Sequence, residues 1–85
     1  MGLIIDFNEN WDSQTKSDVD DALRKCIAEP PDDEKWVVSL AAGFAQHYCE
    51  IRIKTPRQTR THFFFEEPRH LPAAIIAWIN LYPLR

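Results

Sequence analysis

The sequence predicts a small α+β domain in which two helices pack on one face of a three- or four-stranded antiparallel sheet. Three patterns lead to this prediction. Apolar residues recur with helical period near both ends of the chain, and the middle alternates between polar and apolar residues. The expected order of elements is (β)αβββα. With 85 residues, 45% of them hydrophobic, the chain is expected to form a single domain over 1–85 with one core.

The N-terminal part is predicted to contain a short edge strand and the first helix. Leu3–Phe7 is the candidate edge strand. A helix is expected from Ser13 or Ser17 to Ala28, where Ser17 and Asp20 would form a capping pair. Its apolar residues recur at i, i+3, i+4, i+7 and i+8 and are Val19, Ala22, Leu23, Cys26 and Ile27. The two prolines that follow would end this helix.

The middle of the chain is predicted to form strands. Trp36–Ala42 is expected to be a strand because its first residues are β-prone, although a helical period also fits this segment. Tyr48–Lys54 and Thr59–Glu66 alternate with period two and are expected to form an antiparallel hairpin around the turn Thr55–Gln58. In its second strand the expected inward residues are Thr61, Phe63 and Phe65, and the expected outward residues are Arg60, His62 and Phe64.

The last helix is expected from His70 or Leu71 to about Leu81, with Pro72 in its first turn. Its expected core-facing stripe is Leu71, Ala74, Ile75, Trp78, Ile79 and Tyr82. The order αβββα resembles the double-stranded-RNA-binding domain in topology. That family has a basic stretch at the start of its last helix, whereas the segment from Leu71 to Leu84 contains no Lys or Arg. We therefore assign no family, since the order of elements does not establish function.

The charge of the chain is divided between its two halves. Residues 1–34 hold ten acids and three bases, and residues 35–85 hold three acids and seven bases. The whole chain has a net charge of −3. The longest uncharged runs, 36–49 and 71–84, are shorter than the roughly 20 residues that span a membrane. No secretory leader is recognisable. We therefore expect a cytoplasmic protein that does not bind membranes and keeps both cysteines reduced.

The last helix indicates a protein partner. No charged residue occurs from Leu71 to Leu84, although a surface helix normally places charges toward solvent. Its residues off the core-facing stripe are Ala73, Ile76, Ala77 and Asn80. We therefore expect a non-enzymatic protein-interaction or regulatory module that forms a homodimer through these residues. The alternative is that the helix is buried on both sides within one chain.

A second hypothesis is nucleic-acid binding by the basic hairpin Arg52–Arg60. Basic and aromatic side chains would track a backbone and stack on bases. The candidate residues are Tyr48, Arg52, Lys54, Arg57, Arg60 and Phe64. The net negative charge weakens attraction to phosphate, so nucleic acid ranks below protein as a partner.

A third hypothesis is a small thiol or metal enzyme at Cys49 and His47, with His62 on the neighbouring strand. The chain contains no Cys-x-x-Cys and no His-x-x-x-His spacing, which are typical of zinc sites. It also contains no phosphate loop and no dinucleotide fingerprint. We therefore expect no metal, no cofactor and no catalytic residues.

Overall fold

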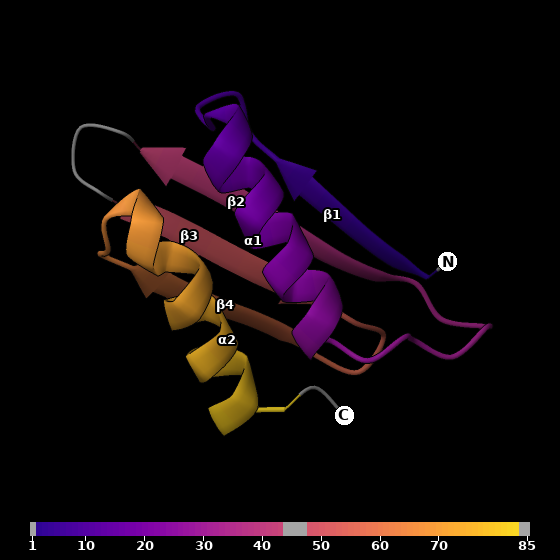
Figure 1. Ribbon diagram of the computed structural model, residues 1–85. Coiled ribbons are helices and arrows are strands. Elements are labelled where there is room, and N and C mark those ends of the chain that lie inside the picture. Colours follow the sequence, from indigo (N-terminus) through magenta and orange to yellow (C-terminus); the bar gives the residue numbers. More distant parts are fainter. Residues whose placement is uncertain (1, 44–47, 84–85) are drawn as a thin grey trace.

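The computed structural model describes residues 2–43 and 48–83 and shows two layers, a four-stranded sheet and two helices on one of its faces (Figure 1). The elements in chain order are β1 (Leu3–Phe7), α1 (Ser13–Cys26), β2 (Trp36–Gly43), β3 (Tyr48–Lys54), β4 (Thr59–Phe64), one 3-10 turn (Pro68–His70) and α2 (Leu71–Leu81). The predicted α+β class and element order are confirmed.

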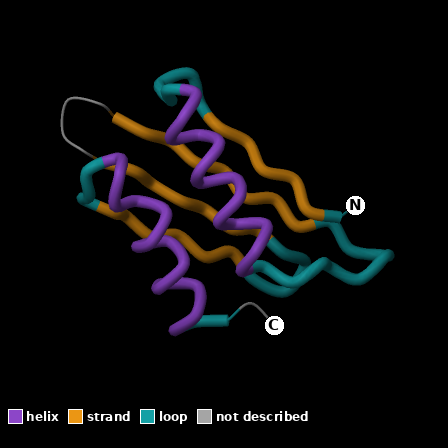
Figure 2. Tube along the Cα trace, in the orientation of Figure 1, coloured by secondary structure: helices purple, strands orange, loops and turns teal. Residues whose placement is uncertain are grey.

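The strands lie in the order β1-β2-β3-β4, so β1 and β4 form the two edges. The register pairs Leu3 with Trp36 in a parallel ladder, while β2–β3 and β3–β4 are antiparallel. The sheet is therefore mixed rather than wholly antiparallel. The reason is α1, which crosses over the sheet and returns the chain to the end from which β1 started (Figure 2).

Helix α1 begins where the side chain of Asp12 accepts a hydrogen bond from the backbone N–H of Thr15 at 3.1 Å. This cap places the first helical residue at Ser13, so the expected cap of Ser17 with Asp20 is wrong. The predicted apolar stripe is buried at Val19, Ala22 and Leu23. The helix ends at Cys26, two residues earlier than expected.

Trp36–Gly43 forms a strand, as predicted, and its inner side chains are the centre of the core. Trp36, Val38 and Leu40 are at most 5% exposed. The indole N–H of Trp36 donates to the carboxylate of Glu34 at 2.9 Å, which satisfies the polar edge of this ring.

The orientation of β4 is opposite to the prediction. The turn Thr55–Gln58 joins strands that pair Lys54 with Thr59, so Ile53 lies opposite Arg60 and Cys49 lies opposite Phe64. Directly paired residues of neighbouring strands share one face of the sheet. Arg60, His62 and Phe64 therefore lie on the helix-covered face. Phe64 is 6% exposed, whereas Phe63 and Phe65 are exposed on the other side.

Helix α2 packs on the sheet through four buried side chains, Leu71, Ile75, Trp78 and Ile79, and it also contacts α1. The ring of Trp78 stacks on His62, with centroids 5.0 Å apart, and meets the edge of Phe64 at 5.8 Å. These contacts fix α2 over β3 and β4. Neither helix in the described part of the chain is long and apolar enough to cross a membrane.

Candidate functional site

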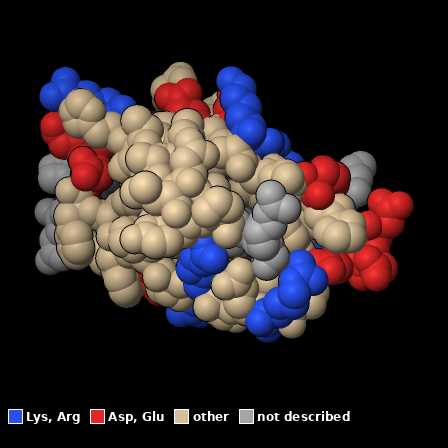
Figure 3. Space-filling view, turned by 90° about the horizontal axis from the view of Figure 1, so that it is seen from below, with Lys and Arg blue, Asp and Glu red and all other residues tan. Residues whose placement is uncertain are grey.

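The outward side of α2 is a surface without charge. The helix contains no charged residue, and only one of its sides faces the core. Ala73, Ala77, Asn80 and Leu81 are exposed on the other side, and Leu81 is 73% exposed. Figure 3 views the molecule from the side of α2 and shows a broad uncharged area with Lys, Arg, Asp and Glu only around it. We call the exposed residues Ala73, Ala77, Asn80 and Leu81 the α2 patch.

The structure places the sequence-predicted residues of this helix in two different environments. Ala73, Ala77 and Asn80 are exposed, whereas Ile76 is half-buried. Residues 73, 77 and 81 are spaced by four, so they form one ridge along the helix. Leu81 was not among the predicted residues, although its spacing from Ala77 was a signal that placed it on this ridge.

The second uncovered surface is the open face of the sheet, which neither helix covers (Figure 1). Tyr48, Phe63 and Phe65 form an aromatic cluster there. The rings of Tyr48 and Phe63 are stacked with centroids 5.8 Å apart, and Phe65 lies 5.7 Å from Tyr48. The sequence signal for this cluster is the four-residue turn before β4, which fixes the register that turns Phe63 outward.

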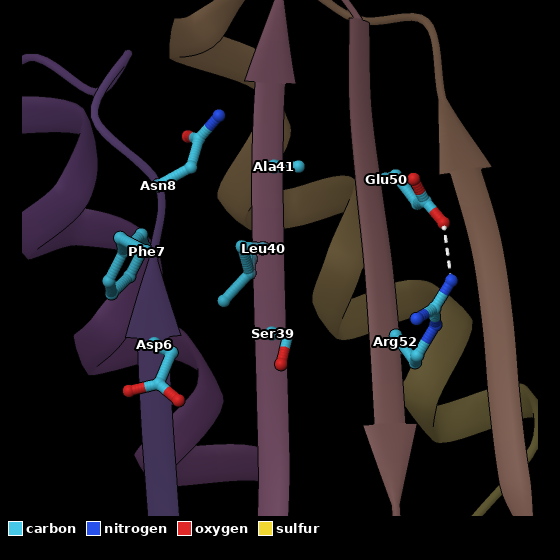
Figure 4. A pocket seen from close by; sticks show the side chains of 8 residues that line it. All are labelled: Asp6, Phe7, Asn8, Ser39, Leu40, Ala41, Glu50 and Arg52. Atoms are coloured by element: carbon cyan, nitrogen blue, oxygen red, sulfur yellow. Dashed lines mark hydrogen bonds and ion pairs between the residues drawn. The ribbon is translucent and has the colours of Figure 1, made fainter.

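A shallow hollow of about 320 Å³ lies near this cluster on the open face. Its floor consists of the small residues Ser39 and Ala41 on β2, which Figure 4 shows between Asp6 on β1 and Glu50 with Arg52 on β3. Glu50 and Arg52 form an ion pair at 3.3 Å. Asp6 forms no ion pair with any residue that the structure describes, so the hollow has no strong attraction for an anion.

The basic hairpin proposed for nucleic acid is divided by the fold. Arg57 forms a bidentate pair with Glu34 at 2.7 and 3.0 Å, and this contact lowers the pKa of the Glu34 carboxyl. Arg60 lies on the helix-covered face and donates to the carbonyl oxygen of Tyr82. The outward position predicted for Phe64 is wrong, because its side chain is buried. Of the predicted basic residues, only Lys54 has a side chain that forms no ion pair or hydrogen bond with the described residues.

The candidate thiol Cys49 is buried on the inner face of β3, with 2% exposure. Burial, together with the smaller effect of the nearby charge of Glu50, raises the pKa of the Cys49 thiol to about 12. A thiol with this pKa is protonated at neutral pH and is a poor nucleophile or metal ligand. His47 lies outside the described residues. Within residues 2–43 and 48–83, no group of three or more His, Cys, Asp or Glu side chains is placed to hold a metal ion.

Comparison of the chain with protein-family models, curated proteins and solved structures finds no match. We therefore infer function from the two uncovered surfaces.

Proposed function

We propose that the protein is a non-enzymatic interaction module that forms a homodimer through the α2 patch. The observation that carries this proposal is a surface helix with no charged residue and with Ala73, Ala77, Asn80 and Leu81 exposed to solvent. Solvent-facing helix positions are normally charged or polar, and extended apolar surfaces are rare on soluble monomers.

A second copy of the same helix fits this patch. Alanines at positions 73 and 77 allow two helix axes to approach to about 8 Å, the lower end of the usual range. The ridge of Ala73, Ala77 and Leu81 has the spacing of the commonest helix packing, in which such ridges interdigitate at about −50°. A twofold axis then places the same patch on both chains. Because the patch carries no charge, salt has little effect on such a dimer.

Sedimentation at about 50 µM tests the proposal, because dimer formation depends on concentration. We expect the wild type to sediment as a dimer and Ala77→Glu as a monomer with an unchanged circular dichroism spectrum. The structure favours Ala77 over Ile76 for this test, since Ala77 is exposed and its substitution spares the core. Gln14→Glu, at an exposed position of α1, is the matched control and should remain dimeric.

Two results would contradict the proposal. A wild type that sediments as a monomer excludes the homodimer, and an Ala77→Glu variant that remains dimeric excludes the α2 patch as its interface.

The regulatory role that we expect from the small acidic chain would be exercised through this binding.

Nucleic-acid binding on the open face of the sheet receives less support than the homodimer. The aromatic cluster there offers surfaces on which bases could stack. The charge of Arg52 is neutralised by Glu50, and the negative charge of Asp6 offsets that of Lys54, so these residues give the face no net positive charge that would attract phosphate.

A further inference from the structure

The outer edge of β1 carries backbone groups that no described element binds. The N–H of Trp36 donates to the carbonyl of Gly2, and the N–H of Asn8 donates to the carbonyl of Leu40. In a parallel ladder, alternate residues direct both backbone groups to the same neighbour. The even-numbered residues of β1 therefore bind β2, and Leu3, Ile5 and Phe7 direct their N–H and C=O groups to the open edge.

The inner face of the sheet is incompletely covered beside this edge. Ile5 and Phe7 are half-buried, whereas the inner residues of β2 are almost wholly buried. A groove of about 490 Å³ runs between α1 and β1. It is lined by Ile5, Phe7, Trp11, Ser13, Lys16, Ser17 and Asp20. One more strand beside β1 would extend the sheet past α1, and its inward side chains would pack against these apolar side chains.

Two polar features of the groove indicate the chemistry of a segment that would bind there. The ammonium group of Lys16 lies 5.5 Å from the ring centroid of Phe7 and forms no ion pair with any described residue. Asp20, the acid nearby, is paired with Arg24 at 3.2 Å, so the unpaired charge at the groove is positive. The indole N–H of Trp11 is buried and has no hydrogen-bond partner within the described residues, so an acceptor is missing there.

The other edge strand is better protected. β4 places the charged side chain of Arg60 on its inner face, and an inward-pointing charged side chain at an edge opposes pairing with another strand. β1 has no charge on its inner face, since its only charged residue, Asp6, lies on the open face.

We propose that β1 binds an extended segment of another protein, which adds to the sheet as a fifth strand. Its backbone would pair with Leu3, Ile5 and Phe7, and its alternate side chains, which are mainly apolar, would enter the groove between α1 and β1. An acidic side chain at one of these groove-facing positions would lie near Lys16. This proposal is independent of the α2 patch, which lies on the other helix.

Two synthetic peptides test this proposal. Both alternate Val with Thr, so that Val faces the groove, and one central Val is replaced by Glu in one peptide and by Lys in the other. Titration into the ¹⁵N-labelled protein should shift the amide resonances of Leu3, Ile5 and Phe7 and the indole resonance of Trp11. We expect the Glu peptide to bind about fivefold more tightly, because one partly exposed ion pair contributes up to about 1 kcal/mol.

Charge reversal separates recognition from unspecific association. Lys16→Glu should reverse the preference between the two peptides, whereas Lys25→Glu, at an exposed position outside the groove, should leave it unchanged. The proposal is overturned if neither peptide binds, if the shifts fall on β4, or if Lys16→Glu keeps the original preference. It is also overturned if a second copy of the chain already occupies the edge of β1. Repeating the titration with Ala77→Glu makes the result independent of the homodimer.

Discussion

The stacked pair of Trp78 and His62 provides the sharpest test of how α2 is held. Trp78 is 8% exposed, and its ring lies nearly parallel to that of His62, at 19°. Truncating it to alanine removes the contact with His62 and the edge contact with Phe64. The substitution therefore weakens the attachment of α2 to the part of the sheet that it covers.

The expected loss follows from the buried area. A tryptophan removes about 150–250 Å² from water, which corresponds to about 4–6 kcal/mol at 25 cal/mol per Å². Truncations of buried Phe and Trp lower the free energy of unfolding by about 3–5 kcal/mol. We therefore expect Trp78→Ala to lower it by about 4 kcal/mol. A domain of this size has about 4–13 kcal/mol in total, so the loss amounts to at least about a third of the stability of the domain.

Thermal unfolding followed by circular dichroism measures this effect. Each kcal/mol shifts the Tm by about 4–8 °C in a domain of this size, so we expect Trp78→Ala to melt at least about 15 °C below the wild type. His62→Ala is the control that keeps the Trp78 ring and removes the stack together with the edge contact of His62 with Phe64, and it should lose about 0.5–1.5 kcal/mol for each of these two ring pairs. A Trp78→Ala variant that melts within about 5 °C of the wild type would refute the argument that this ring anchors α2.

Two further predictions concern titratable groups. Arg57 lowers the pKa of Glu34 below its ordinary value of 4.5, so the stabilisation from this pair is complete above that value and is lost as the pH falls through the lower folded-state pKa. The free energies of urea unfolding of wild type and Glu34→Gln should therefore differ at pH 7, and the difference should shrink as the pH falls below 4.5. A difference that stays constant as the pH falls would contradict this prediction. Burial should protect Cys49 from iodoacetamide in the folded protein, with labelling only after urea is added, and rapid labelling of Cys49 in the native protein at neutral pH would show that the inner face opens.

The helices could be predicted because the apolar residues of each recur with helical period along one side. In α2, the expected core-facing residues Leu71, Ile75, Trp78 and Ile79 are buried and Ala74 is half-buried. Tyr82, also expected to face the core, lies just beyond the end of the helix and is 58% exposed, so that part of the prediction is wrong. The parallel pairing of β1 was not predicted, although a strand, a helix and a second strand that lie side by side imply it.

The orientation of β4 was not predictable from alternation alone. Phe63, Phe64 and Phe65 are consecutive, so both phases of the strand contain large apolar residues. The choice is made by β3, whose inward phase is unambiguous, and by a turn whose length pairs Lys54 with Thr59. Consequently the aromatic cluster on the open face was missed, and Phe64 was assigned to the wrong face.

The position of β1 in the sheet also affects the order in which the chain assembles. β3 and β4 are joined by a turn of four residues, whereas β1 pairs with a strand on the far side of α1, so that Leu3 meets Trp36. Closing a longer loop costs more chain entropy, and contacts distant in sequence form more slowly. We therefore expect β3 and β4 to pair early in folding and β1 to join the sheet late. The same strand would then be the first to detach in native-state fluctuations, which would make its amides among the fastest of the sheet to exchange with solvent deuterium.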